Sequence, residues 1–99
     1  MGIKNKTIIL LNEHLENLSK LISCTDNSER KFNEQLQSEF RYFTEIKRCF
    51  AKNTSVPPTK IIILEEKLER YKKHNKYRYM IAKAVIDLNN SFEQEEVPF

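Results

Sequence analysis

Glycine and proline are scarce in this chain of 99 residues: glycine occurs once and proline three times. Folds rich in β-strands need many tight turns, and those turns usually use glycine and proline. The scarcity therefore argues against a strand-rich fold and favours helices joined by few, short connections. A chain of this length fits one domain with a single small hydrophobic core.

Long hydrophobic runs are lacking as well. The apolar runs Ile8–Leu11 and Ile61–Leu64 are far shorter than the roughly 20 residues of a membrane-spanning helix. The first residues also lack the apolar core of a secretory signal peptide. Cys24 and Cys49 form no Cys-x-x-Cys motif, and two such cysteines in a cytosolic protein are typically reduced thiols. We therefore expect a cytoplasmic protein without a membrane span.

Residues that carry catalysis or bind metals do not converge in a motif. His14 and His74 have no further ligands at a metal-binding spacing, and we interpret them as a surface or boundary residue and a loop residue. The neighbours Glu65 and Glu66 would diverge by about 100° on a helix, which favours a solvated face over an acid–base pair. The chain has no glycine-rich phosphate loop and no nucleophile motif. The sequence therefore predicts a protein that is not an enzyme and holds no cofactor or metal.

Residues 27–52 carry the strongest helical pattern. Large apolar residues recur there on one helix face, and charged residues occupy the opposite face. The apolar stripe consists of Phe32, Leu36, Phe40, Phe43, Ile46 and Phe50. Four phenylalanines on one stripe need a partner surface, because burial of each ring contributes roughly 1.5–3 kcal/mol. We therefore expect this helix to form the centre of the core, with the other helices covering it.

The segments on either side also read as helices. Residues 7–23 repeat apolar side chains at spacings of three and four, which is typical of the seam of a packed helix. Asp26 followed by Glu29 resembles a capping box at the start of the second helix. The clearest loop is 53–59, in which Pro58 suits the first turn of a third helix.

The last part of the chain holds two apolar stripes that do not align. On one straight helix, the stripes of 61–71 and 77–92 would lie roughly 130° apart. We therefore predict a break at His74-Asn75, and one continuous helix serving two partners stays as the alternative. Folding back at the break yields an antiparallel four-helix bundle, with a single helical domain over 1–92 and a mobile acidic tail over 93–99.

Positive charge is concentrated in residues 67–83, which have seven Lys and Arg against one Glu in a chain of net charge +3. A break at His74-Asn75 would gather four cations at one end of the bundle: Lys72, Lys73, Lys76 and Arg78. We predict an exposed basic corner there that binds an acidic or membrane-associated protein partner. The alternative is a solvated corner without a partner. Interleaved tyrosines also allow contact with nucleic acid, expected to be non-specific because no base-reading set is apparent.

The segment Asn53-Thr54-Ser55-Val56-Pro57 resembles a block in immunity proteins for pediocin-like (class II) bacteriocins. In that family the block lies between the second and third helices of an antiparallel four-helix bundle. Pro58 departs from the aliphatic residue expected there, and the basic stretch 72–78 is not matched by the family pattern. The resemblance implies a cytoplasmic protein that protects a bacteriocin-producing cell by recognising a membrane receptor complex. Its C-terminal part would choose which bacteriocin is resisted.

The leading interpretation is a small all-α binding protein that is monomeric or weakly oligomeric. One competing class is a helical subunit of a larger assembly, whose apolar seams pack on partner helices. Another is a nucleic-acid-associated regulator that uses the basic block 67–83. Oligomer size distinguishes the first two classes, because a lone bundle is monomeric at micromolar concentration.

Overall fold

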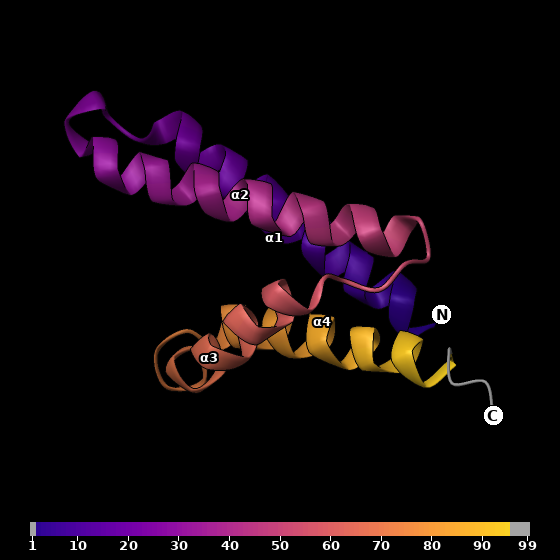
Figure 1. Cartoon of the computed structure of the whole chain (residues 1–99). Helices are drawn as coiled ribbons and strands as arrows, with labels where there is room; N and C mark the ends of the chain where they lie inside the picture. The colour runs from indigo at the N-terminus through magenta and orange to yellow at the C-terminus, as the bar shows by residue number, and fades with distance from the viewer. Residues whose placement is uncertain (1, 96–99) are drawn as a thin grey trace.

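The computed structural model describes residues 2–95 and folds them into four α-helices (Figure 1). The helices in chain order are α1 (Ile3–Cys24), α2 (Arg30–Ala51), α3 (Pro58–His74) and α4 (Lys76–Glu95), and a 3₁₀ turn, η1 (Asn27–Glu29), precedes α2. The described part of the chain contains no strand, so the predicted all-α four-helix fold is confirmed. None of these helices combines the length and the apolar character that a bilayer crossing requires, as far as residues 2–95 are concerned.

The break near His74-Asn75 is present, so α3 and α4 are two separate helices and the continuous helix is excluded. Asn75 has φ −154° and ψ 86°, which is not helical backbone. Its side-chain Oδ1 accepts a hydrogen bond from the backbone N–H of Arg78 at 3.1 Å. This is the bond that an N-cap residue makes to the third residue of its helix. Asn75 therefore separates the helices by capping the start of α4.

All four helices contribute to the core, and α4 supplies more buried residues to its cluster than any other helix: Ile81, Ala82, Val85, Ile86 and Leu88. Phe43, Ile46 and Phe50 of α2 are almost fully buried. They share one cluster with Leu11 and Leu15 of α1 and with residues of α3 and α4. Phe32 is an exception within the predicted stripe, because its side chain is 48% exposed.

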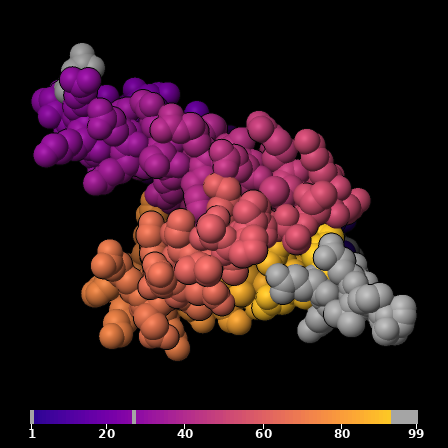
Figure 2. Space-filling view, in the orientation of Figure 1, coloured from indigo at the N-terminus to yellow at the C-terminus, as the bar shows by residue number. Residues whose placement is uncertain are grey.

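The bundle is open along one side. Helix α1 packs against both α2 and α4, and α3 packs against α4, but no Cα atom of α2 lies within 8 Å of a Cα atom of α3. The α1–α2 and α3–α4 hairpins diverge away from the loop that joins α2 to α3 (Figure 1). In the space-filling view, the purple end of the α1–α2 hairpin extends beyond the orange α3–α4 turn (Figure 2). Within the described residues, no further helix covers the side between α2 and α3.

The loop between α2 and α3 is anchored to α4. Val56 is buried in this loop, and its backbone N–H donates to Oδ1 of the buried Asn89 at 2.7 Å. Phe50 of α2 stacks on Phe92 of α4 beside it, with ring centroids 5.8 Å apart. The turn out of α2 uses Asn53 at φ 58°, a left-handed conformation that asparagine tolerates after a helix end. These contacts hold the two hairpins together at this end of the bundle.

The predicted acidic tail, 93–99, overlaps the last helix. The backbone of α4 continues to Glu95, beyond the predicted end of the domain at Phe92. The remainder of the predicted tail, 96–99, lies outside the residues that the structure describes. The prediction of a single domain over 1–92 stays a prediction.

Candidate binding groove

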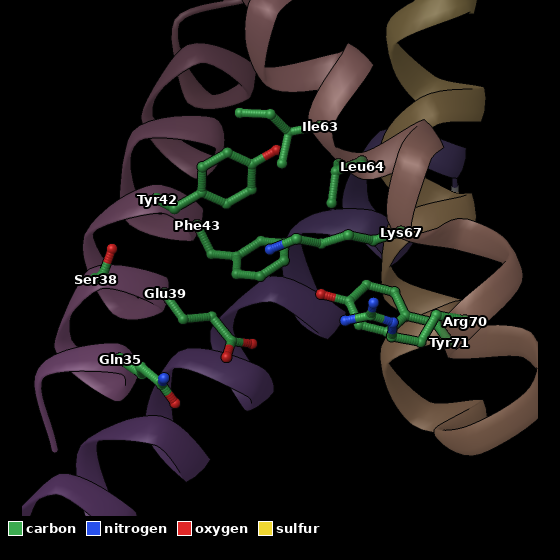
Figure 3. Close-up of a pocket in the computed structure, with 10 residues that line it drawn as sticks. All are labelled: Gln35, Ser38, Glu39, Tyr42, Phe43, Ile63, Leu64, Lys67, Arg70 and Tyr71. Atoms are coloured by element: carbon green, nitrogen blue, oxygen red, sulfur yellow. The ribbon is translucent and has the colours of Figure 1, made fainter. Parts of the chain in front are cut away.

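A groove of about 580 Å³ lies between α2 and α3, on the open side of the bundle (Figure 3). From α2 it is lined by Gln35, Ser38, Glu39, Tyr42 and Phe43. From α3 it is lined by Ile63, Leu64, Lys67, Arg70 and Tyr71. The floor and walls thus combine aromatic and aliphatic side chains with hydroxyl, amide and cationic groups, which is the mixture found in binding sites.

One end of the groove is closed by contacts of Lys60, at the start of α3. The Tyr42 hydroxyl donates a hydrogen bond to the backbone carbonyl of Lys60. The Lys60 ammonium pairs with Glu45 of α2 at 2.6 Å and lies 4.9 Å from the centroid of the Tyr42 ring. Burial, together with the nearby Tyr71, raises the pKa of the Tyr42 hydroxyl, which therefore keeps its proton and stays a donor. These contacts hold α3 against α2 at this end.

At the other end, Glu39 turns its carboxylate toward α1 and α4. Arg78 of α4 binds it in a bidentate pair, with Nε 2.9 Å from Oε2 and Nη2 3.0 Å from Oε1. His14 of α1 completes the set, with Nε2 2.8 Å from Oε2. The network of Glu39, His14 and Arg78, which we call the Glu39 network, therefore joins three helices through one carboxylate.

The electrostatics of the Glu39 network favour the ionised carboxylate. Burial alone would raise the pKa of Glu39, but the hydrogen bonds from His14 and Arg78 and the charge of Arg78 lower it to about 2. The same pairing raises the pKa of the Arg78 guanidinium above its ordinary value. Glu39 is therefore ionised at neutral pH, and it is occupied by partners within the protein rather than poised as an acid.

The imidazole of His14 is packed between aromatic rings. Its centroid lies 5.0 Å from that of Phe43 and 5.7 Å from that of Tyr77, both in edge-to-face geometry. Because Nε2 faces a carboxylate oxygen, we assign the proton to Nε2. The other ring nitrogen, Nδ1, is buried and has no hydrogen-bond partner in the structure. The interpretation of His14 as a surface or boundary residue is therefore wrong, since it is 3% exposed.

The structure separates the four predicted partner-binding residues. Lys72, Lys73 and Lys76 are exposed around the α3–α4 turn, while Arg78 is half-buried in its pair with Glu39. The cause is the Asn75 cap: it makes Arg78 the third residue of α4, and the Arg78 side chain reaches Glu39 of α2. The exposed basic corner is therefore the three lysines without Arg78, and its role in partner binding stays a prediction.

Sequence reasoning missed two members of the Glu39 network, although a signal was present for each. His14 lies three residues after Leu11 and four before Leu18, which places it on the buried face of α1. Glu39 lies four residues before Phe43, on the same face of α2. A polar residue at the spacing of an apolar stripe predicts a buried polar group with a partner. The groove itself had no such signal, because periodicity does not show that two helices stand apart.

Within residues 2–95, no cluster of three or more His, Cys, Asp or Glu residues is placed to hold a metal ion. No protein-family model, curated protein or solved structure matches this chain. The features of this structure that bear on function are the α2–α3 groove, the Glu39 network and the three exposed lysines.

Proposed function

We propose that this protein is a non-catalytic binding protein and that the α2–α3 groove receives its partner. The observation that supports this is the separation of two helices that are consecutive in the chain. They are joined at the loop end, yet over the described residues none of their Cα atoms approach within 8 Å. The exposed Ile63 and the half-buried Tyr42 and Tyr71 line the groove, where a closed bundle would cover them. An apolar centre with a polar rim is the usual composition of a protein-binding surface.

A more specific proposal is that the protein acts as an immunity protein in the cytoplasm of a cell that makes a pediocin-like bacteriocin. The support is the resemblance of Asn53–Pro57 to the block of that family. In the fold, this block includes Val56, which anchors the loop to α4 through Asn89 at the closed end of the groove. The partner would be a receptor complex in the membrane, contacted from the cytoplasmic side.

The basic corner formed by Lys72, Lys73 and Lys76 would assist this binding without a pocket of its own. Exposed charges around an interface mainly raise the rate of association and the sensitivity to salt. The cytoplasmic surface of membranes is negative and attracts lysines over about a Debye length. The corner lies at the turn that follows Arg70, so it would bring a membrane-associated partner toward the groove.

The test is protection of a bacterium sensitive to pediocin-like bacteriocins. The chain is expressed in that bacterium, and growth is measured against a panel of those bacteriocins. Wild-type protein should protect against at least one of them. Ser38→Trp, which places an indole in the groove, should abolish protection, whereas Ser19→Trp on the exposed outer side of α1 should retain it.

The outcomes separate the two levels of the proposal. Full protection by the Ser38→Trp protein would show that the groove is not the binding surface. If wild-type and Ser19→Trp proteins are folded and expressed but confer no protection against any member of the panel, the immunity proposal is wrong. Circular dichroism of each purified variant checks that the helices are retained.

A second candidate function is a subunit of a larger helical assembly, and the observation that favours it is the exposed apolar surface at the far end of the α1–α2 hairpin. Leu21 and Phe32 are each nearly half exposed there. The hydrogen bond from Asn33 Nδ2 to the carbonyl of Ile22 shows that these parts of α1 and α2 are neighbours. Sedimentation at micromolar concentration distinguishes the candidates. A stable oligomer that dissociates into monomers in the Phe32→Ser variant would favour assembly through this end.

A further inference from the structure

We infer that the occupant of the α2–α3 groove is an acidic amphipathic helix, with its apolar residues on the groove floor and its carboxylates against α3. The inference rests on the proposed function, because it names the chemistry of the partner segment that the groove would receive. It is carried by the spacing of the groove walls, the apolar floor and the distribution of unpaired charge.

Both walls present side chains at the spacing of a helix-packing seam. On α3, Ile63 is followed at four residues by Lys67 and at three more by Arg70. On α2, Gln35, Ser38 and Tyr42 follow at three and four. Rows of this spacing form ridges that pack into the grooves between side chains of another helix. The walls are helices whose backbone groups are bonded internally, so they offer no sheet edge to an extended peptide, and a helix in a groove is the matching mode.

The floor is apolar and firmly placed. Phe43 and Leu64 are 3% and 1% exposed and belong to the core, so the floor does not need to form on binding. Ile63 stands above them on the wall of α3 and is 40% exposed. Its neighbour Ile62 is 51% exposed but does not line the groove. The apolar surface that a partner can cover is therefore specific to one side of α3.

The unpaired charge that lines the groove is positive. Lys67 and Arg70 are exposed and have no carboxylate within 4.0 Å among the described residues. In Figure 3 the Lys67 side chain extends from α3 toward Phe43, across the groove. The carboxylate that lines the groove, Glu39, is already held by Arg78 and His14. A partner that supplies carboxylates would form ion pairs with these cations, whereas a basic partner would be repelled.

The length of the groove fixes how much of the partner helix is in contact. Ile63 and Tyr71 mark the extent of its α3 wall, a rise of about 12 Å at 1.5 Å per residue, or about two helical turns. An interface of this size is at the small end of specific protein interfaces, so we expect a dissociation constant on the order of 10 µM. The Lys60 contacts close one end, so the partner helix would project past Gln35 and Arg70, toward the basic corner.

The experiment measures binding of fluorescein-labelled peptides to the full chain by fluorescence anisotropy at low salt. The first peptide has about 16 residues, roughly four turns, with Leu at spacings of three and four and Glu elsewhere. The second replaces every Glu by Lys. The third has the composition of the first in an order that breaks the Leu spacing. We expect the first peptide to bind and the other two to bind at least about tenfold more weakly, a difference of about 1.4 kcal/mol.

Two matched pairs of variants locate the site. Ile63→Asn should weaken binding of the first peptide about tenfold, and Ile62→Asn, one residue away and similarly exposed, by less than about threefold. The double variant Lys67→Glu/Arg70→Glu should weaken it more than tenfold. Its control, Lys72→Glu/Lys73→Glu, makes the same change of net charge on the same helix outside the groove. Equal losses in both members of each pair would mean general attraction, and would overturn the inference.

Anionic vesicles of phosphatidylserine and phosphatidylcholine test a membrane as the occupant instead. The inference fails if wild-type protein binds these vesicles but not the acidic peptide, and if the Lys72→Glu/Lys73→Glu variant no longer binds the vesicles. That result would show that the basic corner binds lipid. Failure of the peptide to bind, while Ser38→Trp still abolishes protection, would refute the acidic helix and leave the proposed function standing. Peptide binding without protection would refute the immunity proposal alone.

Discussion

The two ends of the α2–α3 pair differ in what α2 contacts. At the loop end, α2 meets α3 and α4 directly, through Tyr42 on Lys60 and Phe50 on Phe92. Farther from the loop, α2 meets α1 and α4 through Glu39, and Arg70 and Tyr71 of α3 face it only across the groove. One amphipathic helix therefore contacts α3 and α4 near the loop and forms a wall of the groove over residues 35–43.

This difference shows that an apolar stripe predicts burial only where another helix reaches it. Phe32 and Phe43 lie on the same stripe and were both expected in the core. Phe43 is 3% exposed, whereas Phe32, near the start of α2, is 48% exposed because α3 and α4 do not extend that far along the hairpin. Two phenylalanines on the same stripe therefore contribute unequally to the free energy of folding.

The largest expected effect compares these two phenylalanines. Phe43→Ala should reduce the free energy of unfolding by about 3–5 kcal/mol, as truncation of a core phenylalanine does. Phe32→Ala should reduce it by less than about 1 kcal/mol, because much of the ring is in water already. Urea denaturation followed by circular dichroism measures both. Similar losses from the two variants would show that the hairpin end is packed in solution and that the open side closes.

The second prediction concerns the Glu39 network. Glu39→Gln should reduce the free energy of unfolding by about 2 kcal/mol at neutral pH, because it weakens charge-assisted hydrogen bonds to Arg78 and His14. Glu45→Gln is the control: the Glu45 side chain is 54% exposed, so loss of its charge should have little effect. Equal effects would mean that the network contributes no more than a surface ion pair.

Wild-type protein and the Glu39→Gln variant should lose stability to different extents as the pH falls. The pKa of Glu39 is lowered from 4.5 to about 2 on folding, so the stabilisation is complete above about pH 4.5 and is lost as the pH falls toward about 2. Over that interval, wild-type protein should lose more stability than Glu39→Gln, and the gap between their unfolding free energies should shrink. Urea melts at several pH values measure the gap, and a gap independent of pH would contradict the assignment.

Much of the fold follows from local signals in the sequence. The number of helices, the break before α4 and the burial of Phe43 and Phe50 all follow from periodicity and from proline or asparagine at boundaries. Pro58 starts α3 as its fixed φ and missing N–H predict. These features depend on residues close together in the chain, so one sequence is enough to predict them.

The binding groove did not follow from the sequence, because it depends on the relative placement of whole helices. Lys67 and Arg70 were assigned to a general basic block, and nothing in their spacing showed that α2 would stand away from α3. Arg78 was placed on the exposed corner for a related reason. Its pairing with Glu39 joins residues 39 positions apart, and depends on the Asn75 cap for its direction.

A fourth prediction tests the closed end through its loop anchor. Asn89→Ala removes the acceptor of the buried Val56 N–H and should cost about 1–3 kcal/mol, the usual penalty for an unsatisfied buried group. Asn90→Ala, on the exposed neighbour, should change stability by less than about 0.5 kcal/mol. Hydrogen exchange of the Val56 amide gives a local readout. Unchanged protection of that amide in Asn89→Ala would show that the loop is held by other contacts.

The smallest expected effect comes from the basic corner, and it distinguishes the three exposed lysines from Arg78. Reversal of Lys72, Lys73 and Lys76 to Glu should shift the melting temperature by at most about 6–12 °C, because each exposed side chain contributes within about 0.5 kcal/mol, or about 1.5 kcal/mol for the three. Adding Arg78→Glu should lower it much further, because a second carboxylate would then face Glu39 where the guanidinium now binds. Thermal denaturation followed by circular dichroism compares the triple and quadruple variants. If both variants melt far below wild type at the same temperature, the lysines support the fold and are not a free surface for steering a partner. If both variants melt near the wild-type temperature, Arg78 does not hold Glu39 in solution, and the corner of four cations expected from the sequence would be correct.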